Sequence, residues 1–173
     1  EPAIESLRQV RRLDPADRGV TRILSELLEP TDPNEAAELL VADYKRSHSV
    51  EVLLRLARLY RDDGRYRDAD EAMRTLLTRC PRDAALWIEA GELAVQSGDH
   101  TTARARLEYA VALNEDRASR LALARVDMQT GHFASAGRGL WRLWRRGDRD
   151  GEVNCGFVVA CLAAGRLRLA EKI

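Results

Sequence analysis

The chain contains 173 residues, of which 45% are hydrophobic and 32% are charged, and this composition predicts a folded protein. Its 28 basic and 28 acidic residues give zero formal charge, which argues against nucleic acid as a partner because nucleic-acid-binding proteins rely on a broad positive field. No stretch approaches the roughly 20 apolar residues that span a bilayer, and the first five residues lack the features of a signal peptide. We therefore expect a chain that is not embedded in a membrane.

The sequence of residues 1–49 predicts three helices that are not joined by a glycine turn. Residues 3–15 have the apolar spacing of one helix, which we interpret as the second helix of a repeat whose first helix is missing, over residues 1–17. A degenerate repeat follows at residues 18–49. At its turn, Asp32 is predicted to cap the second helix, Pro33 to occupy the first helical position and Glu35 to complete a capping box.

Four glycines mark a recurring unit along the rest of the chain. Separated by 34, 33 and 34 residues, they are Gly64, Gly98, Gly131 and Gly165. At two and five positions after these glycines stand Tyr66, His100, Phe133 and Leu167, and then Ala69, Ala103, Ala136 and Ala170. Apolar residues recur every three or four positions on both sides, which predicts a helix, a left-handed glycine turn and a second helix. We predict repeats at residues 50–83, 84–116 and 117–150, and a partial repeat at residues 151–173.

These units resemble the tetratricopeptide repeat family. Residues 53–81 carry most of its pattern, namely Leu56, Ala57, Tyr60, Gly64, Arg65, Tyr66, Ala69 and Pro81. The next unit supplies Trp87, Gly91, Gly98, Ala103 and Ala110. The resemblance implies a single array with an all-α fold, a right-handed α-solenoid of antiparallel helix-turn-helix repeats, and a role in binding proteins. Because both ends fall inside a repeat, we expect a longer array in the parent protein, and the strong bias toward arginine over lysine indicates a GC-rich bacterial genome.

In such an array, the first helices line the concave wall, and one stripe of each faces a partner. By register, this concave stripe is Arg55, Arg58, Asp62, Glu89, Glu92, Gln96, Arg125, Gln129 and Val159. The stripe passes from charged to apolar, which favours a peptide with charges at one end and an apolar anchor at the other. Two alternatives stay open. In the first, the charged residues form a solvated face, and the apolar helix over residues 153–164 is covered by a following repeat. In the second, four charged residues that alternate in sign along the stripe form ion pairs with each other, namely Glu26, Arg58, Glu92 and Arg125.

Trp141 is an anomaly on the opposite, convex wall. Earlier repeats carry Arg74 and Glu108 at its position, so this tryptophan is predicted to face solvent. With Arg138 and Arg145 it forms a candidate convex contact, because tryptophan and arginine supply much of the binding energy at protein interfaces. The alternatives are covering by arginine stems or a local rotation of the helix. Stacking on single-stranded bases is disfavoured by the neutral charge of the chain.

The sequence shows no catalytic, cofactor-binding or metal-binding set of residues. Its three histidines are scattered, and its three cysteines lack metal-ligand spacing. We expect Cys80, Cys155 and Cys161 to be buried, reduced thiols, which favours a cytoplasmic location, with the periplasm as the alternative.

Three functions stay open at this point. The first is a non-catalytic scaffold that binds a peptide or a folded protein in a concave groove within a multiprotein assembly. The second is a self-associating or envelope-machinery scaffold, as in secretion, pilus or exopolysaccharide export. The third is the regulatory arm of an enzyme whose catalytic domain lies elsewhere, since the chain itself is expected not to be an enzyme.

Overall fold

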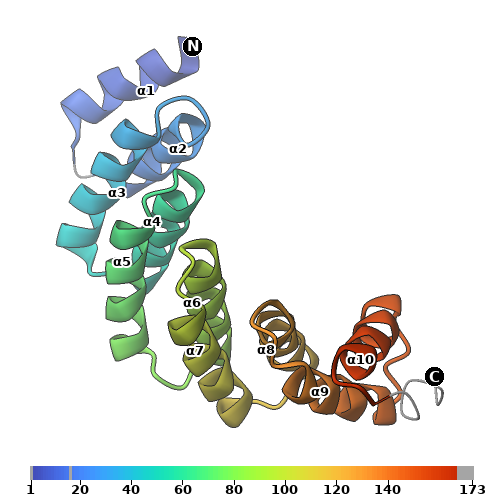
Figure 1. Cartoon of the computed structure of the whole chain (residues 1–173). Helices are drawn as coiled ribbons and strands as arrows, with labels where there is room; N and C mark the ends of the chain where they lie inside the picture. The colour runs from blue at the N-terminus through green and yellow to red at the C-terminus, as the bar shows by residue number, and fades with distance from the viewer. Residues whose placement is uncertain (1, 16, 167–173) are drawn as a thin grey trace. The chain divides into compact units, whose positions relative to one another are not determined.

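The computed structural model describes residues 2–15 and 17–166, and these residues form ten α-helices and no strand. The chain divides into two compact units, Glu1–Arg79 and Cys80–Ile173. The first contains α1 (Pro2–Leu13), α2 (Arg18–Leu28), α3 (Pro33–Ser47), α4 (Val50–Asp62) and α5 (Tyr66–Arg79) (Figure 1). The second contains α6 (Ala84–Gln96), α7 (His100–Leu113), α8 (Arg117–Gln129), α9 (Phe133–Arg145) and α10 (Gly151–Ala163). The predicted all-α fold is confirmed.

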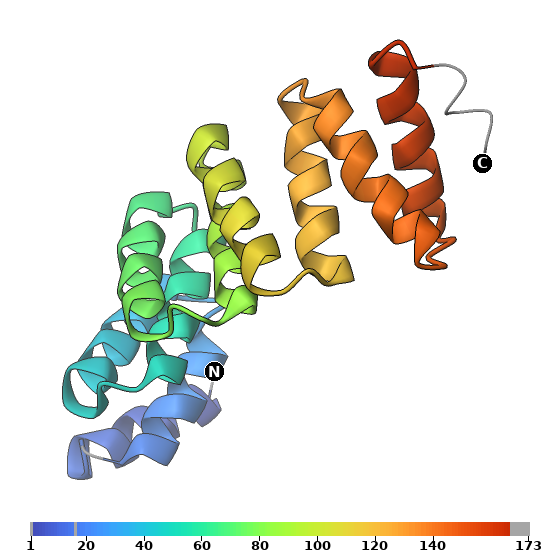
Figure 2. The same ribbon diagram turned by 90° about the horizontal axis from the view of Figure 1, so that it is seen from below.

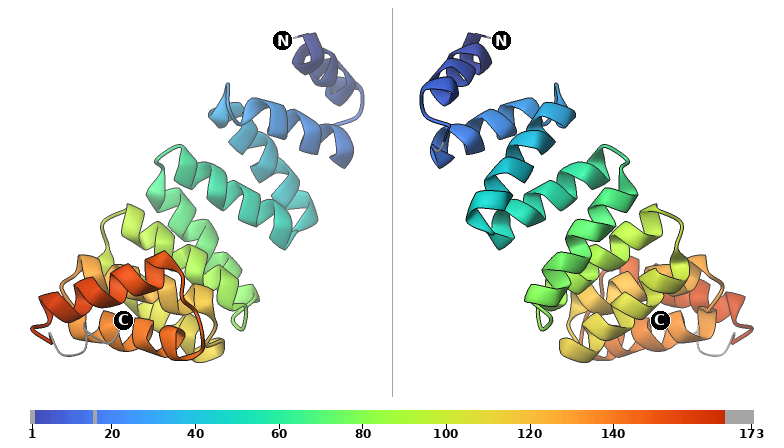
Figure 3. Two further views of the ribbon diagram at one scale, coloured as in Figure 1. Left: turned by 90° about the vertical axis from the view of Figure 1, so that its right-hand side faces the viewer. Right: turned by 90° about the vertical axis from the view of Figure 1, so that its left-hand side faces the viewer.

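Within each unit, consecutive helices form antiparallel hairpins. In the first unit, α2 packs on α3 and α4 packs on α5 (Figure 3). In the second unit, α6 packs on α7 and α8 packs on α9 (Figure 2). Successive hairpins also touch, through α3 and α4 in the first unit and through α7 and α8 in the second. The predicted helix-turn-helix architecture is therefore confirmed within each unit.

Aspartates begin most of these helices. Asp32 accepts a hydrogen bond from the backbone N–H of Glu35 at 3.0 Å, as predicted, and Pro33 is the first residue of α3. The predicted capping box is wrong, because the Glu35 carboxylate instead binds Arg8 of α1 at 3.1 Å. The Asp32 N–H donates to the carbonyl oxygen of Leu28. Other helices begin after a capping carboxylate at Asp17, Asp83, Asp99, Asp116 and Asp150.

The predicted turn glycines adopt the left-handed backbone. Their φ values lie between +69° and +82° at Gly64, Gly98, Gly131 and Gly165. A Cβ at any of them would meet nothing within 4 Å, so the conformation alone requires glycine there. The predicted small residues that follow are buried at Ala69, Ala103 and Ala136. The predictions for Leu167 and Ala170 lie outside the described residues.

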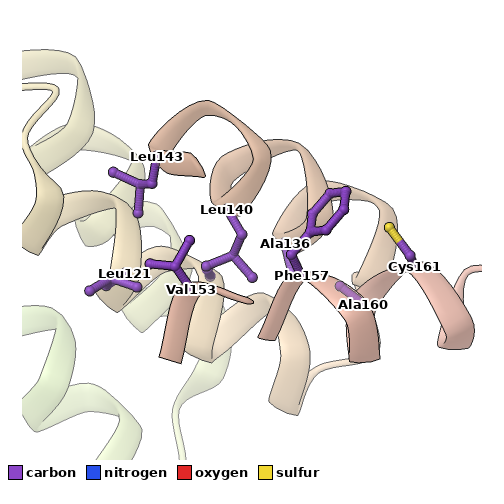
Figure 4. Close-up of a cluster of buried hydrophobic side chains, with 9 residues drawn as sticks. Leu121, Ala136, Leu140, Leu143, Val153, Phe157, Ala160 and Cys161 are labelled. Atoms are coloured by element: carbon purple, nitrogen blue, oxygen red, sulfur yellow. The ribbon is translucent and has the colours of Figure 1, made fainter. Parts of the chain in front are cut away.

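A hydrophobic cluster fills the space between α8, α9 and α10. Leu140 of α9 lies beside Val153 of α10, and Phe157 and Cys161 continue the cluster along α10 (Figure 4). Leu121 of α8 also belongs to this cluster. A second cluster joins α6, α7 and α8 and consists of Ala94, Ala103, Leu107, Ala122 and Val126.

A recurring arginine contact, which was not predicted, ties the second helix of a repeat to the segment before its first helix. The guanidinium of Arg46 binds the carbonyl oxygen of Pro15, that of Arg79 binds His48 and that of Arg146 binds Glu115, at 2.6, 2.6 and 2.9 Å. Each contact spans 31 residues. The three arginines share one register position, and Leu113 takes that position in the remaining repeat.

Candidate functional site

In the first unit, the predicted concave stripe lies on α4. Arg58 and Asp62 are exposed, whereas only 21% of the Arg55 side chain is exposed. The Arg55 guanidinium binds Glu29 of α2 at 2.8 Å and lies 3.5 Å from Glu26. Arg55 therefore joins two first helices, so part of this stripe is structural.

In the second unit, the stripe occupies α6, α8 and α10. Its exposed members are Glu92, Gln96, Arg125, Gln129 and Val159, and Glu89 is partly buried. The two helices α6 and α8 are in direct contact, so one partner could reach exposed residues of both. The structure thus places these members of the stripe on the first helices, outside the hydrophobic clusters.

The ion pairs along the stripe differ from those that the alternation of charge predicts. Glu26 meets Arg55 rather than the arginine at the matching position of the next repeat. Arg125 binds Glu152 of α10 at 2.6 Å. Each of these pairs joins two first helices within one unit, but neither is a pair between two members of the predicted set of Glu26, Arg58, Glu92 and Arg125.

The surface of α10 is apolar where the stripe continues. Val159 and Leu162 are 49% and 52% exposed. Cys155 is also exposed and Cys80 is partly buried, so the prediction of buried thiols is wrong for these two cysteines. Cys161 is buried, and burial raises the pKa of its thiol. The thiol of Cys155 is exposed because one face of the apolar helix that carries it is not covered by any of the described residues.

Trp141 was predicted to face solvent, and this prediction is wrong. Its ring stacks on Trp144 with ring centroids 4.8 Å apart and on Phe157 of α10 with centroids 5.4 Å apart. It packs against the hydrophobic cluster of α8, α9 and α10. The sequence of its own helix could not show this, because the covering ring of Phe157 comes from the next repeat.

An apolar pocket of about 170 Å³ lies beside Trp141, between α9 and α10. We call it the α9–α10 pocket. Aromatic rings of Phe133, Trp141 and Phe157 line it together with the small residue Gly137, and the exposed Arg138 also lines it. Arg145, the other predicted convex residue, is exposed and does not line the pocket.

The described residues contain no group of three or more histidine, cysteine, aspartate or glutamate side chains that could hold a metal ion. His48 ends α3 with a left-handed φ of 50°. The Nδ1 atom of His132 lies 2.7 Å from the hydroxyl of Thr130, in the turn before α9. No helix in the described part of the chain combines the length and apolarity needed to cross a bilayer.

Comparison with known families agrees with this architecture. The family model of the tetratricopeptide repeat matches residues 50–93, which hold α4, α5 and most of α6. The part of the chain that holds α4, α5 and most of α6 is therefore similar to the tetratricopeptide repeat family. Among proteins of curated function, none matches its sequence.

Several solved structures, the first of them a tetratricopeptide repeat protein, resemble the chain over most of its length. One from Parabacteroides merdae ATCC 43184 has a TM-score of 0.75 and 21% identity, covering 98% of this chain and 69% of that one. The MamA protein of Desulfovibrio magneticus RS-1 has a TM-score of 0.73 and 14% identity, covering 89% of each chain. Pseudomonas aeruginosa PilF has a TM-score of 0.70 and 15% identity, covering 99% of this chain and 81% of that one. At these identities the likeness concerns the fold alone.

Proposed function

We propose that this protein is a non-catalytic scaffold that holds a peptide segment or a folded partner against the exposed faces of its first helices. One observation carries the proposal. The first helices of the second unit present a row of exposed side chains that take no part in the hydrophobic clusters, namely Glu92, Gln96, Gln129, Val159 and Leu162. Side chains placed in this way are available to a partner.

The chemistry of this row favours a partner with two kinds of anchor. Glu92 gives the α6 end a negative charge, and the amides of Gln96 and Gln129 can donate and accept hydrogen bonds. Val159 and Leu162 give the α10 end an apolar character. A segment with a basic end and an apolar end therefore matches the row better than a uniformly charged one.

A second candidate function is self-association. The exposed Val159 and Leu162 lie three positions apart on one face of α10, where a second copy of the chain could cover them. A scaffold of this kind would sediment as an oligomer at micromolar concentration. Val159→Glu would return it to the monomer.

A displayed peptide library panned against the full chain tests the main proposal. The dissociation constant of the strongest binder is then measured by calorimetry for the wild type, Gln96→Arg and Gln129→Arg. Ala112→Arg is the matched control, because it introduces the same side chain at an exposed position of the second helix α7. We expect about tenfold or greater weakening, about 1.4 kcal/mol, for the first two variants and little change for the control. Equal affinity for all four proteins would reject the proposed surface.

A further inference from the structure

Two successive interfaces of the second unit differ at three register positions. Between α7 and α8, Nε of Arg104 donates to Asp127 at 2.8 Å, and Nη2 of Arg104 lies 2.9 Å from Glu108. Only 1% of Asp127 is exposed. One repeat later, the positions of Arg104, Glu108 and Asp127 carry Gly137, Trp141 and Cys161.

This exchange removes all three charges and leaves space. Gly137 has no side chain to reach across the interface, and a Cβ there would lie 3.6 Å from the Cβ of Ala160 without a clash. The volume that remains is the α9–α10 pocket of about 170 Å³. A cavity of about 150 Å³ with apolar walls accepts benzene. The pocket can therefore hold one phenyl ring or one leucine side chain.

The aromatic and the charged residues that line the pocket specify different chemistry. Phe133, Trp141 and Phe157 offer ring faces and edges to an entering aromatic group. The charged side chains that line the pocket are Arg138 and Arg166, and no carboxylate does so among the described residues. Within that same part of the chain, Arg138 has no hydrogen-bond or ion-pair partner. A carboxylate next to the inserted group would supply one.

We infer that the α9–α10 pocket is a docking site for a phenylalanine or leucine side chain of a partner segment in which aspartate or glutamate flanks that residue. The site rests on the proposed scaffold function and adds a second contact surface to it. It lies on the second helix α9 and its neighbour α10, whereas the row that carries the proposed function lies on the first helices.

An acetylated, amidated pentapeptide with phenylalanine between two pairs of aspartates tests the site on the full chain. The indole N–H resonance of Trp141 is followed by NMR, and affinity is measured by calorimetry. We expect a saturable shift of that resonance. Two matched peptides, one with arginine in place of the aspartates and one with alanine in place of phenylalanine, should each bind at least several-fold more weakly.

Filling the pocket provides the matching test on the protein. The double change Gly137→Arg and Cys161→Asp restores the two charges that Arg104 and Asp127 supply at the preceding interface. It should abolish binding of the aspartate peptide while thermal stability is kept. Gly139→Ala, in the same helix but outside the pocket, should leave binding unchanged, since its Cβ would meet nothing within 4 Å.

Three results would overturn the inference: a Trp141 resonance that does not move at millimolar peptide, equal binding by the filled variant, or equal binding of the arginine peptide. Dimerisation of the wild type that is lost in the filled variant would assign the pocket to a second copy of the chain and would also overturn it. If Gln96→Arg and Gln129→Arg still weaken the library-selected binder, the proposed function survives and this site alone fails.

Discussion

Gly91 of α6 lies against Leu107 of α7 so closely that a Cβ on the glycine would come within 2.6 Å of the leucine Cγ. Leu107 is fully buried in the cluster that joins α6, α7 and α8, so its side chain has no room to turn away. Gly91→Ala is therefore expected to lower the free energy of unfolding by about 1–3 kcal/mol through overpacking. Urea-unfolding curves followed by circular dichroism measure the change.

Gly139→Ala is the matched comparison for this overpacking. Gly139 also lies inside a helix, but a Cβ there would meet nothing within 4 Å. Because alanine is the better helix former, stability should rise by about 1 kcal/mol. Changes of the same sign at Gly91 and Gly139 would show that close helix contact does not decide the effect.

The repeating features of the fold could be predicted because they depend on local backbone and small side chains. Gly64 and Gly98 are identifiable by spacing alone, since a left-handed turn needs glycine wherever it occurs. Ala69 and Ala103 follow from the close approach of paired helices. Such constraints recur with the period of the repeat and are therefore visible in one sequence.

Contacts made by long side chains could not be predicted in the same way. Arg79 is the last residue of α5, but its bond to the carbonyl of His48 depends on where a distant loop lies. The environment of Trp141 depends on Phe157 of the next repeat. The α9–α10 pocket arises from side chains that are missing relative to the preceding repeat, and this becomes visible only when both interfaces are compared.

The arginine contact at the repeat ends gives a second prediction. Arg79 binds the carbonyl oxygen of His48 at 2.6 Å, and its guanidinium also lies over the ring of Tyr44. Arg79→Ala should lower the free energy of unfolding by about 1 kcal/mol, since the bond is charge-assisted but exposed. Arg82→Ala, at an exposed position without a partner among the described residues, should change it by less than about 0.5 kcal/mol. Equal effects in thermal or urea unfolding would argue against the contact.

The cap of α7 makes stability depend on pH. Hydrogen bonds from the hydroxyl and the backbone N–H of Thr102, and then from the hydroxyl of Thr101, lower the pKa of Asp99 from 3.8 to about 2. A folded-state pKa below the unfolded value favours folding above pH 3.8, and this contribution is lost as the pH falls toward 2.

Asp99→Asn tests this dependence because asparagine keeps an acceptor for the cap but does not titrate. The melting temperature of the wild type should exceed that of the variant at pH 5, and the difference should shrink at pH 2. Circular dichroism at the two pH values measures it. A difference that is the same at both would contradict a titrating cap.

The most direct test of the scaffold function uses the native thiol of Cys155. This residue is exposed on α10, one helical turn before Val159, on the surface proposed to hold the partner. Alkylation of Cys155 by N-ethylmaleimide is followed by mass spectrometry with and without the library-selected peptide at saturation. We expect bound peptide to slow the reaction at Cys155 several-fold and to leave the reaction at the partly buried Cys80 unchanged. An unchanged rate at Cys155 with the peptide fully bound would contradict it.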